Sequence, residues 1–302
     1  MTAHPDARKS PILISRLNGG LGNQLFQYAC GRSISLASGV QLVLDASGLQ
    51  SINHRVTRRD FELDVYGIKA RTTTIEEGAK CRRAARWGKI GAWIAGLELV
   101  TEAPDVYPNL RHPIECDTVL EGFWQSENCF ASHSEDIRAD LTPQRELSEQ
   151  SRRIAQFLEA APSVAIHVRR GDYVSLQSAA RFHGTLPLTY YMEAAQRIRA
   201  HDRDAHWVVF SDDIEWCRST LSFLDAPPLF VDHNQDRDAW QDLHLMSLCR
   251  HHIIANSSFS WWGAWLSERH DRKDQMIYAP AKWFVESDPY EEFRIPKRWT
   301  RL

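Results

Sequence analysis

Long hydrophobic runs are missing from this 302-residue sequence. None approaches the roughly 20 consecutive apolar residues that a bilayer-spanning helix needs. Residues 1–10 are polar and lack the apolar core of a signal peptide. We therefore expect a cytoplasmic protein, with at most peripheral contact at the inner face of a membrane.

A large excess of charge is also missing, because 36 basic residues stand against 39 acidic ones and give a net charge of −3. Nucleic-acid binding needs concentrated positive charge, so we expect no nucleic-acid partner. The six cysteines are scattered without a Cys-x-x-Cys pair, which predicts neither a zinc site nor a disulfide framework. We expect reduced and mostly buried thiols instead.

Metal-binding patterns are weak as well. Asp-Arg-Asp occurs at 202–204 and at 236–238, but the first follows a predicted helix and the second begins one, so solvated or capping roles are favoured. His244, His251 and His252 lack the i,i+4 spacing that places two ligands on one helix face. We therefore expect no metal and no other cofactor.

One local cluster of charge is present. Residues 80–89 carry five basic side chains and lead into a mainly apolar stretch at 90–100. Two interpretations stay open. The cluster is either the solvated face of a helix or a patch that touches an anionic membrane surface.

The order of the predicted elements indicates parallel sheets. A strand at 11–17, a glycine-rich turn, a helix at about 24–38 and a strand at 40–45 form a β–loop–α–β unit. From 163 onward strands alternate with helices, and the predicted strands are 164–168, 206–211, 229–231, 252–255 and 276–278. This alternation is typical of a doubly wound α/β sheet, whose ligands bind beyond the carboxyl ends of its strands.

The chain is long enough for two domains, since it is near the size limit of a single core. We assign an N-terminal domain to 11–160 and a C-terminal domain to 161–285, with Pro162 marking the boundary. The tail, 286–302, is expected to pack back on the N-terminal domain. In the first domain we predict further helices at 72–99, 126–137 and 145–158.

The first motif with chemical content ends a buried strand. Residues 167–173 read His-Val-Arg-Arg-Gly-Asp-Tyr, which places Arg169 and Arg170 at the edge where such a sheet binds ligands. Paired guanidinium groups suit a diphosphate, because each offers a planar fork of N–H donors. The alternative is a strand end with solvated arginines, and the flanking His167 and Asp172 argue against it.

A glycine-rich turn, Asn-Gly-Gly-Leu-Gly-Asn-Gln over 18–24, follows the first predicted strand. Glycine lets a backbone approach a ligand closely, and the start of the next helix favours negative charge. Gly22, Asn23 and Gln24 are therefore candidate binding residues. Neither the third glycine of the dinucleotide pattern nor a P-loop Gly-Lys-Ser/Thr is present, and a plain tight turn is the alternative.

A third motif, Phe-Ser-Asp-Asp over 210–213, also ends an apolar strand. A carboxylate at this place can accept hydrogen bonds from a guanine edge or from ribose hydroxyls. Asp212 and Asp213 are therefore candidates for nucleotide binding. Capping of the helix that begins near 214 is the alternative, and the two roles are compatible.

A fourth motif joins a strand to a helix and is rich in small polar residues. Backbone N–H groups and serine hydroxyls at a helix start can form an anion-binding nest. Capping alone is the alternative for this loop, and the tryptophans that follow at 261, 262 and 265 are expected to pack in the core. The candidate residues are Asn256, Ser257, Ser258, Phe259 and Ser260.

Together these four motifs resemble the α-1,2-fucosyltransferases of the bacterial type, glycosyltransferase family 11. They are more distantly similar to α-1,6-fucosyltransferases and protein O-fucosyltransferases, which share the His-x-Arg-Arg block. The matching stretches are 13–30, 164–174, 208–216 and 242–266. Residues 46–162 match poorly, and we expect acceptor choice to lie there.

The resemblance implies a GT-B-like fold with two Rossmann-like domains facing a cleft. It also implies an inverting, metal-independent transfer of L-fucose from GDP-β-L-fucose to the 2-hydroxyl of a β-galactoside. GDP-fucose is then a co-substrate. The acceptor would be a galactose-containing oligosaccharide or surface glycan such as O-antigen, and a lipid-linked precursor is one form of it.

The resemblance also suggests residue roles. Arg169 would stabilise the charge that grows on departing GDP, while Arg170 would fix the loop. His167 and the aspartate pair would hold guanosine, with Asp213 favoured over its neighbour. Asp172 is the candidate general base, and a structural role is its alternative. The glutamate that follows five residues later in the α-1,6 enzymes is Gln177 here.

Three other functions remain as alternatives. A fucosyltransferase of another linkage, α-1,6 or protein O-fucosyl, would share the same donor motifs. An NAD-dependent oxidoreductase would use the N-terminal glycine-rich turn, although its third glycine is missing. A nucleotide-sugar-binding module without catalysis would keep the binding residues and lack the base.

Overall fold

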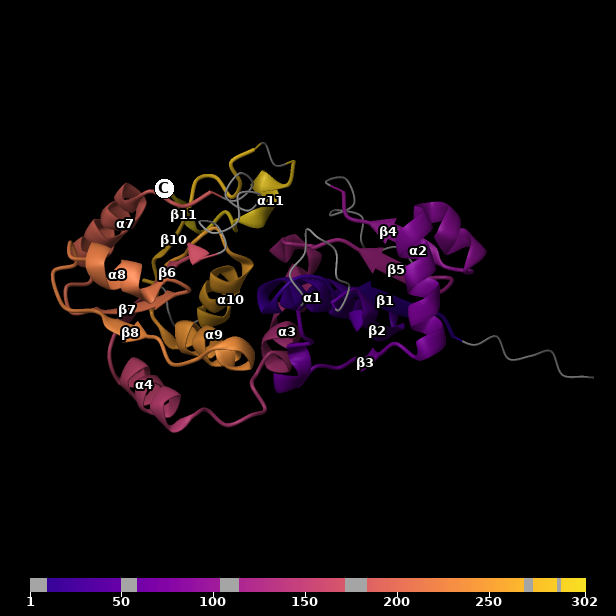
Figure 1. Ribbon diagram of the computed structural model, residues 1–302, viewed down its shortest axis with the longest axis horizontal. Coiled ribbons are helices and arrows are strands. Elements are labelled where there is room, and N and C mark those ends of the chain that lie inside the picture. The colour runs from indigo at the N-terminus through magenta and orange to yellow at the C-terminus, as the bar shows by residue number, and fades with distance from the viewer. Residues whose placement is uncertain (1–9, 50–58, 104–113, 172–183, 269–273, 287–288) are drawn as a thin grey trace, which may run out of the picture. The chain divides into compact units, whose positions relative to one another are not determined.

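The computed structural model describes residues 10–49, 59–103, 114–171, 184–268, 274–286 and 289–302. The chain forms two compact units, Met1–Thr142 and Pro143–Leu302 (Figure 1). The sequence places the boundary at 160/161 instead. The difference lies in one helix, α4 (Glu149–Ala160), whose Ala155 and Leu158 pack in the core of the second unit.

The first unit is built on five parallel strands in the order β3-β2-β1-β5-β4. Two main helices, α1 (Leu21–Ser38) and α2 (Ile75–Ile94), accompany this sheet, and a short one, α3 (Ser134–Asp140), follows it. The strands are β1 (Ile12–Arg16), β2 (Gln41–Asp45), β3 (Arg71–Thr72), β4 (Glu98–Thr101) and β5 (Thr118–Glu121).

Alternation along β1 assigns one helix to each face of this sheet. Ile12 and Ile14 pack in a core with buried residues of α2. The next residue, Ser15, faces α1, where its hydroxyl donates to the carbonyl of Gln27. The first helix ends where the sequence predicts, because Gly39 takes the left-handed conformation with φ of 73°.

The second unit has six parallel strands in the order β11-β10-β9-β6-β7-β8. The strands are β6 (Ser163–Val168), β7 (His206–Ser211), β8 (Leu229–Val231), β9 (His251–Ile253), β10 (Ile277–Ala279) and β11 (Thr300–Arg301). The helices besides α4 are α7 (Leu188–His201), α8 (Ile214–Thr220), α9 (Ala239–Leu248), α10 (Ser258–Ser267) and α11 (Glu291–Arg294).

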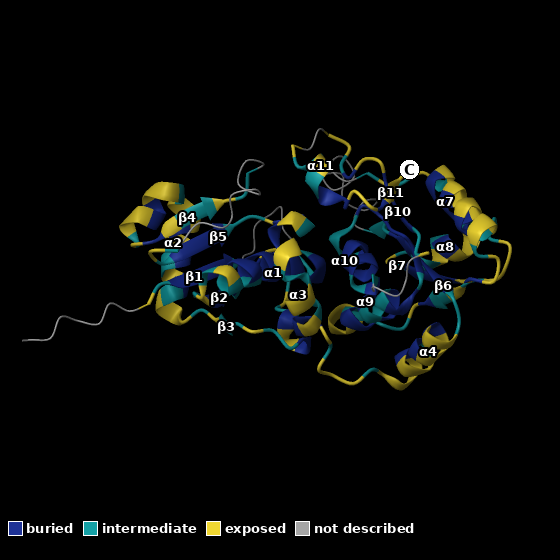
Figure 2. Cartoon of the chain, turned by 180° about the vertical axis from the view of Figure 1, so that it is seen from behind, coloured by how far each residue is buried: buried dark blue, intermediate teal, exposed yellow. Residues whose placement is uncertain are grey.

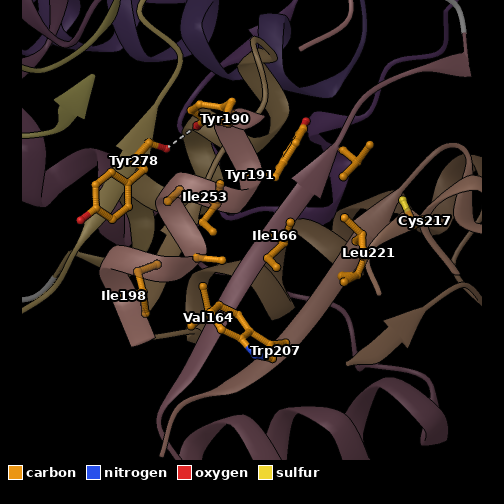
Figure 3. Close-up of a cluster of buried hydrophobic side chains, with 14 of the residues drawn as sticks. Val164, Ile166, Tyr190, Tyr191, Ile198, Trp207, Cys217, Leu221, Ile253 and Tyr278 are labelled. Carbon is orange, nitrogen blue, oxygen red and sulfur yellow. Dashed lines mark hydrogen bonds between the residues drawn. The ribbon is translucent and has the colours of Figure 1, made fainter. Parts of the chain in front are cut away.

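Helices cover both faces of this second sheet, as a doubly wound fold requires. Val164 and Ile166 of β6 point into a core built with α7 and α8, in which the Tyr190 hydroxyl donates to the carbonyl of Tyr278 at 3.0 Å (Figure 3). The intervening Ala165 points to the opposite core, which α4 and α9 complete. The parallel α/β sheet predicted from 163 onward is therefore present.

The C-terminal tail belongs to the second unit, whereas the sequence analysis expects it on the N-terminal domain. Strand β11 pairs in parallel with β10 and extends the sheet by one strand. The Trp299 ring lies 5.4 Å from that of Trp261, and the Trp261 indole N–H donates to the carbonyl of Arg294. The open edge of β10 and this aromatic contact hold the tail on its own unit.

Short 3-10 helices fill several connections: Ala46–Gly48, Leu63–Val65, Glu127–Cys129, Ala131–His133 and Asp236–Asp238. Among the described residues, no helix has the length and apolar character needed to cross a membrane. Figure 2 shows the strands of both sheets mainly buried, while much of α2 is exposed. All six cysteines are free thiols, and five of them are buried.

Candidate functional site

Three of the four sequence motifs meet at one edge of the second sheet. Strand β6 pairs with β7 on one side and with β9 on the other, and all three run parallel. Their carboxyl ends therefore present residues 167–171, 211–213 and 254–260 side by side. This is the edge at which doubly wound sheets bind ligands.

Asp212 anchors the arginine block to the neighbouring strand. Its Oδ2 lies 3.1 Å from Nη1 of Arg169, and its Oδ1 accepts the backbone N–H of Arg170 at 2.8 Å. A Cβ added to Gly171 would stand 2.9 Å from the same carboxylate, so glycine permits this close approach. The Arg169 side chain keeps 29% of its surface exposed. It is thus oriented by a carboxylate and still accessible to a ligand.

Arg170 turns toward a different set of partners. Its Nε lies 3.4 Å from Oδ2 of Asp213, and its guanidinium lies 4.0 Å from the centre of the Trp216 ring. The other oxygen of Asp213 caps α8 by accepting the N–H of Trp216 at 3.2 Å. Arg170 therefore ties the arginine block to α8. The capping alternative for Asp213 is realised, while 36% of this side chain stays exposed.

His167 is held as a neutral imidazole beside the two charged groups. Burial lowers its pKa to about 4; the Asp212 carboxylate opposes this shift and the Arg169 guanidinium adds to it. Its ring centre lies 6.0 Å from that of Phe259. Its Nδ1 is buried and has no hydrogen-bond partner among the described residues. A buried imidazole nitrogen in this position is suited to a hydrogen bond with a ligand.

The serine loop is organised mainly by its own backbone. Ser257 caps α10, because its hydroxyl accepts the N–H of Phe259 at 3.3 Å. The buried Ser260 hydroxyl donates to the carbonyls of Ala255 and Ser257. The Asn256 amide donates to the carbonyl of Trp283 at 3.1 Å. Capping is thus realised here too, and the hydroxyl of Ser260 points inward.

The tryptophans after this loop are core residues, as the sequence predicts. Trp261, Trp262 and Trp265 are each at most 2% exposed and contact one another through their rings. They seat α10 firmly, so the loop before it has a rigid support. Their burial leaves them no surface on which a sugar could stack.

In the first unit the glycine-rich turn is bound to its surroundings by Gln24. Its amide nitrogen donates to the carbonyls of Gly19 and Asp60, at 3.0 and 2.8 Å, and its oxygen accepts the N–H of Glu62. Both amide N–H groups are therefore engaged within the protein. The side chain is fully buried, so it shapes the turn.

Asn23 lies beside Gly22 at the start of α1. Its side-chain oxygen accepts a hydrogen bond of 2.7 Å from Gln125, and the side chain is half-buried. The preceding Gly19 has φ of 78°, a conformation that favours glycine. The turn is therefore an ordered loop that places its backbone amide groups at the start of α1.

A group of three charged residues, which the sequence motifs do not reveal, lies at the corresponding edge of the first sheet. Arg16, the last residue of β1, lies 2.8 Å from Glu121 at the end of β5 and 3.4 Å from Asp45 at the end of β2. Each of these residues ends a strand. The sequence does show a charged residue at the end of each of these strands. It does not show that the strands are neighbours, so the cluster could be recognised only once the strand order was known.

Next to this charged group, the chain leaves β5 in an uncommon conformation. Trp124 is fully buried and has φ of 56°, and the preceding Phe123 is 42% exposed. A large residue in the left-handed region is strained and is held there by its packing. The turn places an exposed aromatic ring just beyond the carboxyl end of the strand.

The candidate base and the possible metal-binding groups complete the comparison with the sequence motifs. Asp172, the candidate base, and Gln177 lie outside them. No group of three or more His, Cys, Asp or Glu side chains suited to a metal ion occurs within the described ranges. Asp202 of the first Asp-Arg-Asp is the partner of His251 at 3.3 Å.

The fold resembles that of fucosyltransferases of known structure. Fucosyltransferase NodZ from Bradyrhizobium superposes with a TM-score of 0.51 and 15% identity, over 85% of this chain and 93% of NodZ. A mutant of FUT1 from Arabidopsis thaliana, in complex with GDP, gives a TM-score of 0.55 and 11% identity, over 94% and 74%. At such identities the likeness shows the fold alone. The predicted fold class, GT-B-like with two parallel-sheet α/β domains, is confirmed.

The fold and the sequence together define a glycosyltransferase. The family model described as Glycosyl transferase family 11 matches residues 107–291. The chain belongs to this family, which the four motifs predict.

The curated relatives agree with this assignment. Alpha-1,2-colitosyltransferase from Escherichia coli is 32% identical over 96% of this chain and 99% of the relative. The O-antigen biosynthesis glycosyltransferase WbnK, also from Escherichia coli, is 32% identical over 90% and 95%. Galactoside alpha-(1,2)-fucosyltransferase 1 from Ateles belzebuth is 31% identical over 49% and 42%. The predicted enzyme class, a glycosyltransferase of the fucosyltransferase type, is confirmed.

Proposed function

We propose that the chain transfers L-fucose from GDP-β-L-fucose to the 2-hydroxyl of a β-galactoside, with inversion at the anomeric carbon. One observation carries the proposal. Arg169, held by Asp212 at 3.1 Å and partly exposed, lies beside the neutral His167 at the ligand-binding edge of the second sheet. This combination suits a nucleoside diphosphate leaving group.

Arg169 would act on the leaving group. The bond from the anomeric carbon to the diphosphate breaks through an oxocarbenium-like state, and negative charge grows on GDP. A guanidinium already fixed by Asp212 needs little reorganisation to stabilise that charge. Such an arrangement performs the neutralisation that a metal ion performs elsewhere, so we propose a reaction that requires neither metal nor other cofactor.

Guanosine and the phosphates would be held by groups around Arg169. The imidazole of His167 offers a hydrogen bond, and Asp213, the aspartate whose side chain is the more exposed of the two, remains the favoured partner of the guanine edge. The half-buried Ser258 and the backbone of the loop 256–260 would add donors at the start of α10. Ser257 and Ser260 would support this loop through their internal hydrogen bonds.

The glycine-rich turn would contribute from the first unit. We propose that the backbone at Gly22 and the amide of Asn23 touch the donor. Gln24 would hold the turn, since its own amide N–H groups are engaged. Asp172 is proposed as the base that removes the proton from the acceptor hydroxyl.

The acceptor would be a galactose-containing glycan, and a lipid-linked surface-glycan precursor is the form we favour. One relative is named for O-antigen biosynthesis, which supports a bacterial surface glycan. We place the enzyme in the cytoplasm, where GDP-fucose would be available.

A second donor sugar, colitose, has to be weighed against fucose. One full-length relative is named a colitosyltransferase, and colitose is fucose without its 3-hydroxyl group. A site that hydrogen-bonds a substrate hydroxyl rejects an analogue lacking it, whereas a site without such a bond discriminates weakly. Fucose is favoured here by the galactoside fucosyltransferase relatives.

The test is a transfer assay with the purified full chain. GDP-fucose and GDP-colitose are supplied separately with a panel of β-galactosides, and the product linkage is determined by NMR. We expect fucose on the galactose 2-hydroxyl, with turnover unchanged by chelator. Faster use of GDP-colitose would mean that colitose, and not fucose, is the donor sugar. Fucose on another hydroxyl would contradict the proposed α-1,2 linkage. Binding of GDP without any transfer would indicate a non-catalytic module, and binding of NAD in place of GDP an oxidoreductase.

A further inference from the structure

Helix α2 exposes a dense group of large apolar side chains. Trp87, Ile90, Trp93 and Ile94 are 62%, 69%, 80% and 59% exposed. Each of the other nine tryptophans of the chain is buried or half-buried. Figure 2 shows this helix as one of the most exposed parts of the first unit. We call these four residues the apolar patch.

A kink in the helix lies between Trp87 and the other three residues of the apolar patch. Gly88 interrupts the helical conformation with φ of 57° and ψ of −141°, which divides α2 into two short helices. A Cβ at Gly91 would stand 2.3 Å from the carbonyl oxygen of Arg83, so the second half folds tightly against the first. Residues 90, 93 and 94 follow i, i+3, i+4 spacing and share one face.

Basic residues adjoin the apolar patch in the sequence. Arg82, Arg83, Arg86 and Lys89 are exposed, and none forms an ion pair with a described residue. Arg86 lies over the ring of Trp87 at 5.6 Å.

The acidic residues of α2 sit apart from this group, in its first turn, and already have partners. Glu77 binds Arg71 through both oxygens and completes a capping box with Thr74, while Glu76 pairs with Lys80. Within the described ranges, the positive charge beside the apolar patch therefore has no acidic partner.

We propose that α2 docks the protein on an anionic lipid bilayer. Tryptophan and isoleucine can insert at the headgroup boundary, and tryptophan prefers that depth. Arginine and lysine alongside them attract acidic headgroups, while their apolar stems stay near the acyl chains. The apolar patch suits the boundary of the acyl chains, and the four basic side chains suit the anionic headgroups.

Charge argues against a second copy of the chain as the occupant. In a two-fold dimer the same surface meets itself, so each basic residue near the axis would face its equivalents. Four unpaired cations on each side would repel one another at short range. A surface carrying the opposite charge is the better complement.

The docking does not depend on catalysis, because α2 contains none of the residues assigned to the donor site. It adds to the proposed function by placing the enzyme where a lipid-linked acceptor lies. Membrane binding and sugar transfer can therefore fail independently. An active enzyme that ignores vesicles would leave the proposed function standing and remove this inference.

Vesicle sedimentation with the full chain tests the proposal. Vesicles of phosphatidylcholine alone and of phosphatidylcholine with about one-third phosphatidylglycerol are compared. We expect binding to the anionic vesicles at low salt, weakened at least about tenfold by high salt or by omission of the anionic lipid. Brominated lipids should quench the fluorescence of Trp87 and Trp93, since these rings enter the bilayer.

Paired variants separate the two contributions. Trp87→Ser with Trp93→Ser should abolish quenching and weaken binding at least about tenfold, and Arg83→Gln with Arg86→Gln should weaken binding and reduce its salt dependence. Arg152→Gln with Arg153→Gln, exposed arginines of α4, should bind as wild type. All variants should keep wild-type transfer to a soluble acceptor and the same unfolding midpoint.

Three results would overturn the inference. Equal binding to neutral and anionic vesicles would remove the role of charge. Binding that survives the tryptophan variant without quenching would place the contact elsewhere. A dimer in sedimentation that the tryptophan variant dissolves, with no vesicle binding, would assign the apolar patch to a second copy.

Discussion

Arg169 and Arg170 are neighbours in the sequence but have different partners in the structure. Arg169 pairs with Asp212 and stays accessible, whereas Arg170 is fixed between Asp213 and the ring of Trp216. A strand end sends successive side chains to opposite sides. One arginine therefore faces the ligand edge while the other secures α8. Their different partners follow from backbone geometry.

Replacement of Arg169 by alanine should lower kcat by about 10²–10³, because the lost contact strengthens in the transition state. The Kd for GDP should change less than kcat. Steady-state kinetics and calorimetry with GDP measure the two effects. Arg197→Ala, which removes an exposed arginine of α7, is the matched control. Near wild-type kcat in the Arg169 variant would exclude it from leaving-group stabilisation.

Replacement of His167 by glutamine tests the neutral imidazole. Its pKa is about 4 in the folded protein, below the 6.5 of a free histidine, because burial disfavours the charged form. Between these values the unfolded chain binds the extra proton, so wild-type stability should fall as pH drops from about 6.5 to about 4.

The His167→Gln variant should lose less stability over that same pH range. Urea unfolding at several pH values measures the difference. Equal pH dependence in the two proteins would mean that His167 is not held neutral. Weaker GDP binding by the variant at pH 8, with its fold intact, would support the nucleotide role separately.

At the scale of elements, the sequence predicts the sheet of the second unit well. Its strands β6 and β7 consist of apolar runs followed by turn residues, so both their existence and their shared edge follow from pattern and topology. The elements of the first unit are harder to predict from the sequence. The helix expected at 126–137 is replaced by two 3-10 turns and α3, because Phe130 and His133 have non-helical conformations that interrupt it.

The hydrogen-bond partners of side chains could not be predicted from the sequence pattern. The bonds of Gln24 to residues 60 and 62 join segments that are far apart in sequence, and an amide at a helix start looks the same whether it faces a ligand or another loop. The capping roles of Asp213 and Ser257 were available as alternatives from local sequence alone. A capping residue can also bind a ligand only if its side chain is exposed, and only the fold provides that exposure.

The contact between α4 and α9 contains an ionisable group with an unusual environment. Burial raises the pKa of Asp242 to about 7, although the Asn234 amide donates to its carboxylate at 2.7 Å. The same asparagine contacts the Ser151 hydroxyl of α4. Between the free value of 3.8 and about 7 the folded state holds a proton that the unfolded state releases. Stability should therefore decline as pH rises through this range.

Replacement of Asp242 by asparagine should remove that decline. The variant keeps an oxygen for Asn234 and carries no charge, so at pH 8 it should be more stable than wild type by up to roughly 4 kcal/mol, the free-energy equivalent of raising the pKa from 3.8 to about 7. The gain should vanish as pH approaches 4. Urea titrations at pH 8, 6 and 4.5 provide the measurement. A variant destabilised at pH 8 would show that the ionised carboxylate is needed at this contact.

At the scale of the whole molecule, the two units have separate sheets and cores. Three of the four motifs proposed for donor binding, at 167–171, 211–213 and 256–260, lie in the second unit, whereas the glycine-rich turn at 18–24 lies in the first. The first unit contributes the exposed Phe123, the charged group around Arg16 and the apolar patch of α2. We therefore propose that the second unit supplies most of the nucleotide contacts, and that acceptor or membrane contact belongs to the first unit.

A fragment covering 143–302 should therefore fold alone and bind GDP with a Kd within about tenfold of the full chain, a difference of about 1.4 kcal/mol, yet transfer no sugar. Calorimetry with GDP and a transfer assay measure the two properties. A second fragment, 161–302, lacks α4 and leaves the core around Val208 and Leu245 uncovered. It should unfold at a lower temperature because that apolar surface meets water. If the longer fragment folds but does not bind GDP, the glycine-rich turn at 18–24 must supply indispensable donors. Equal stability of the two fragments would place the domain boundary at 160/161.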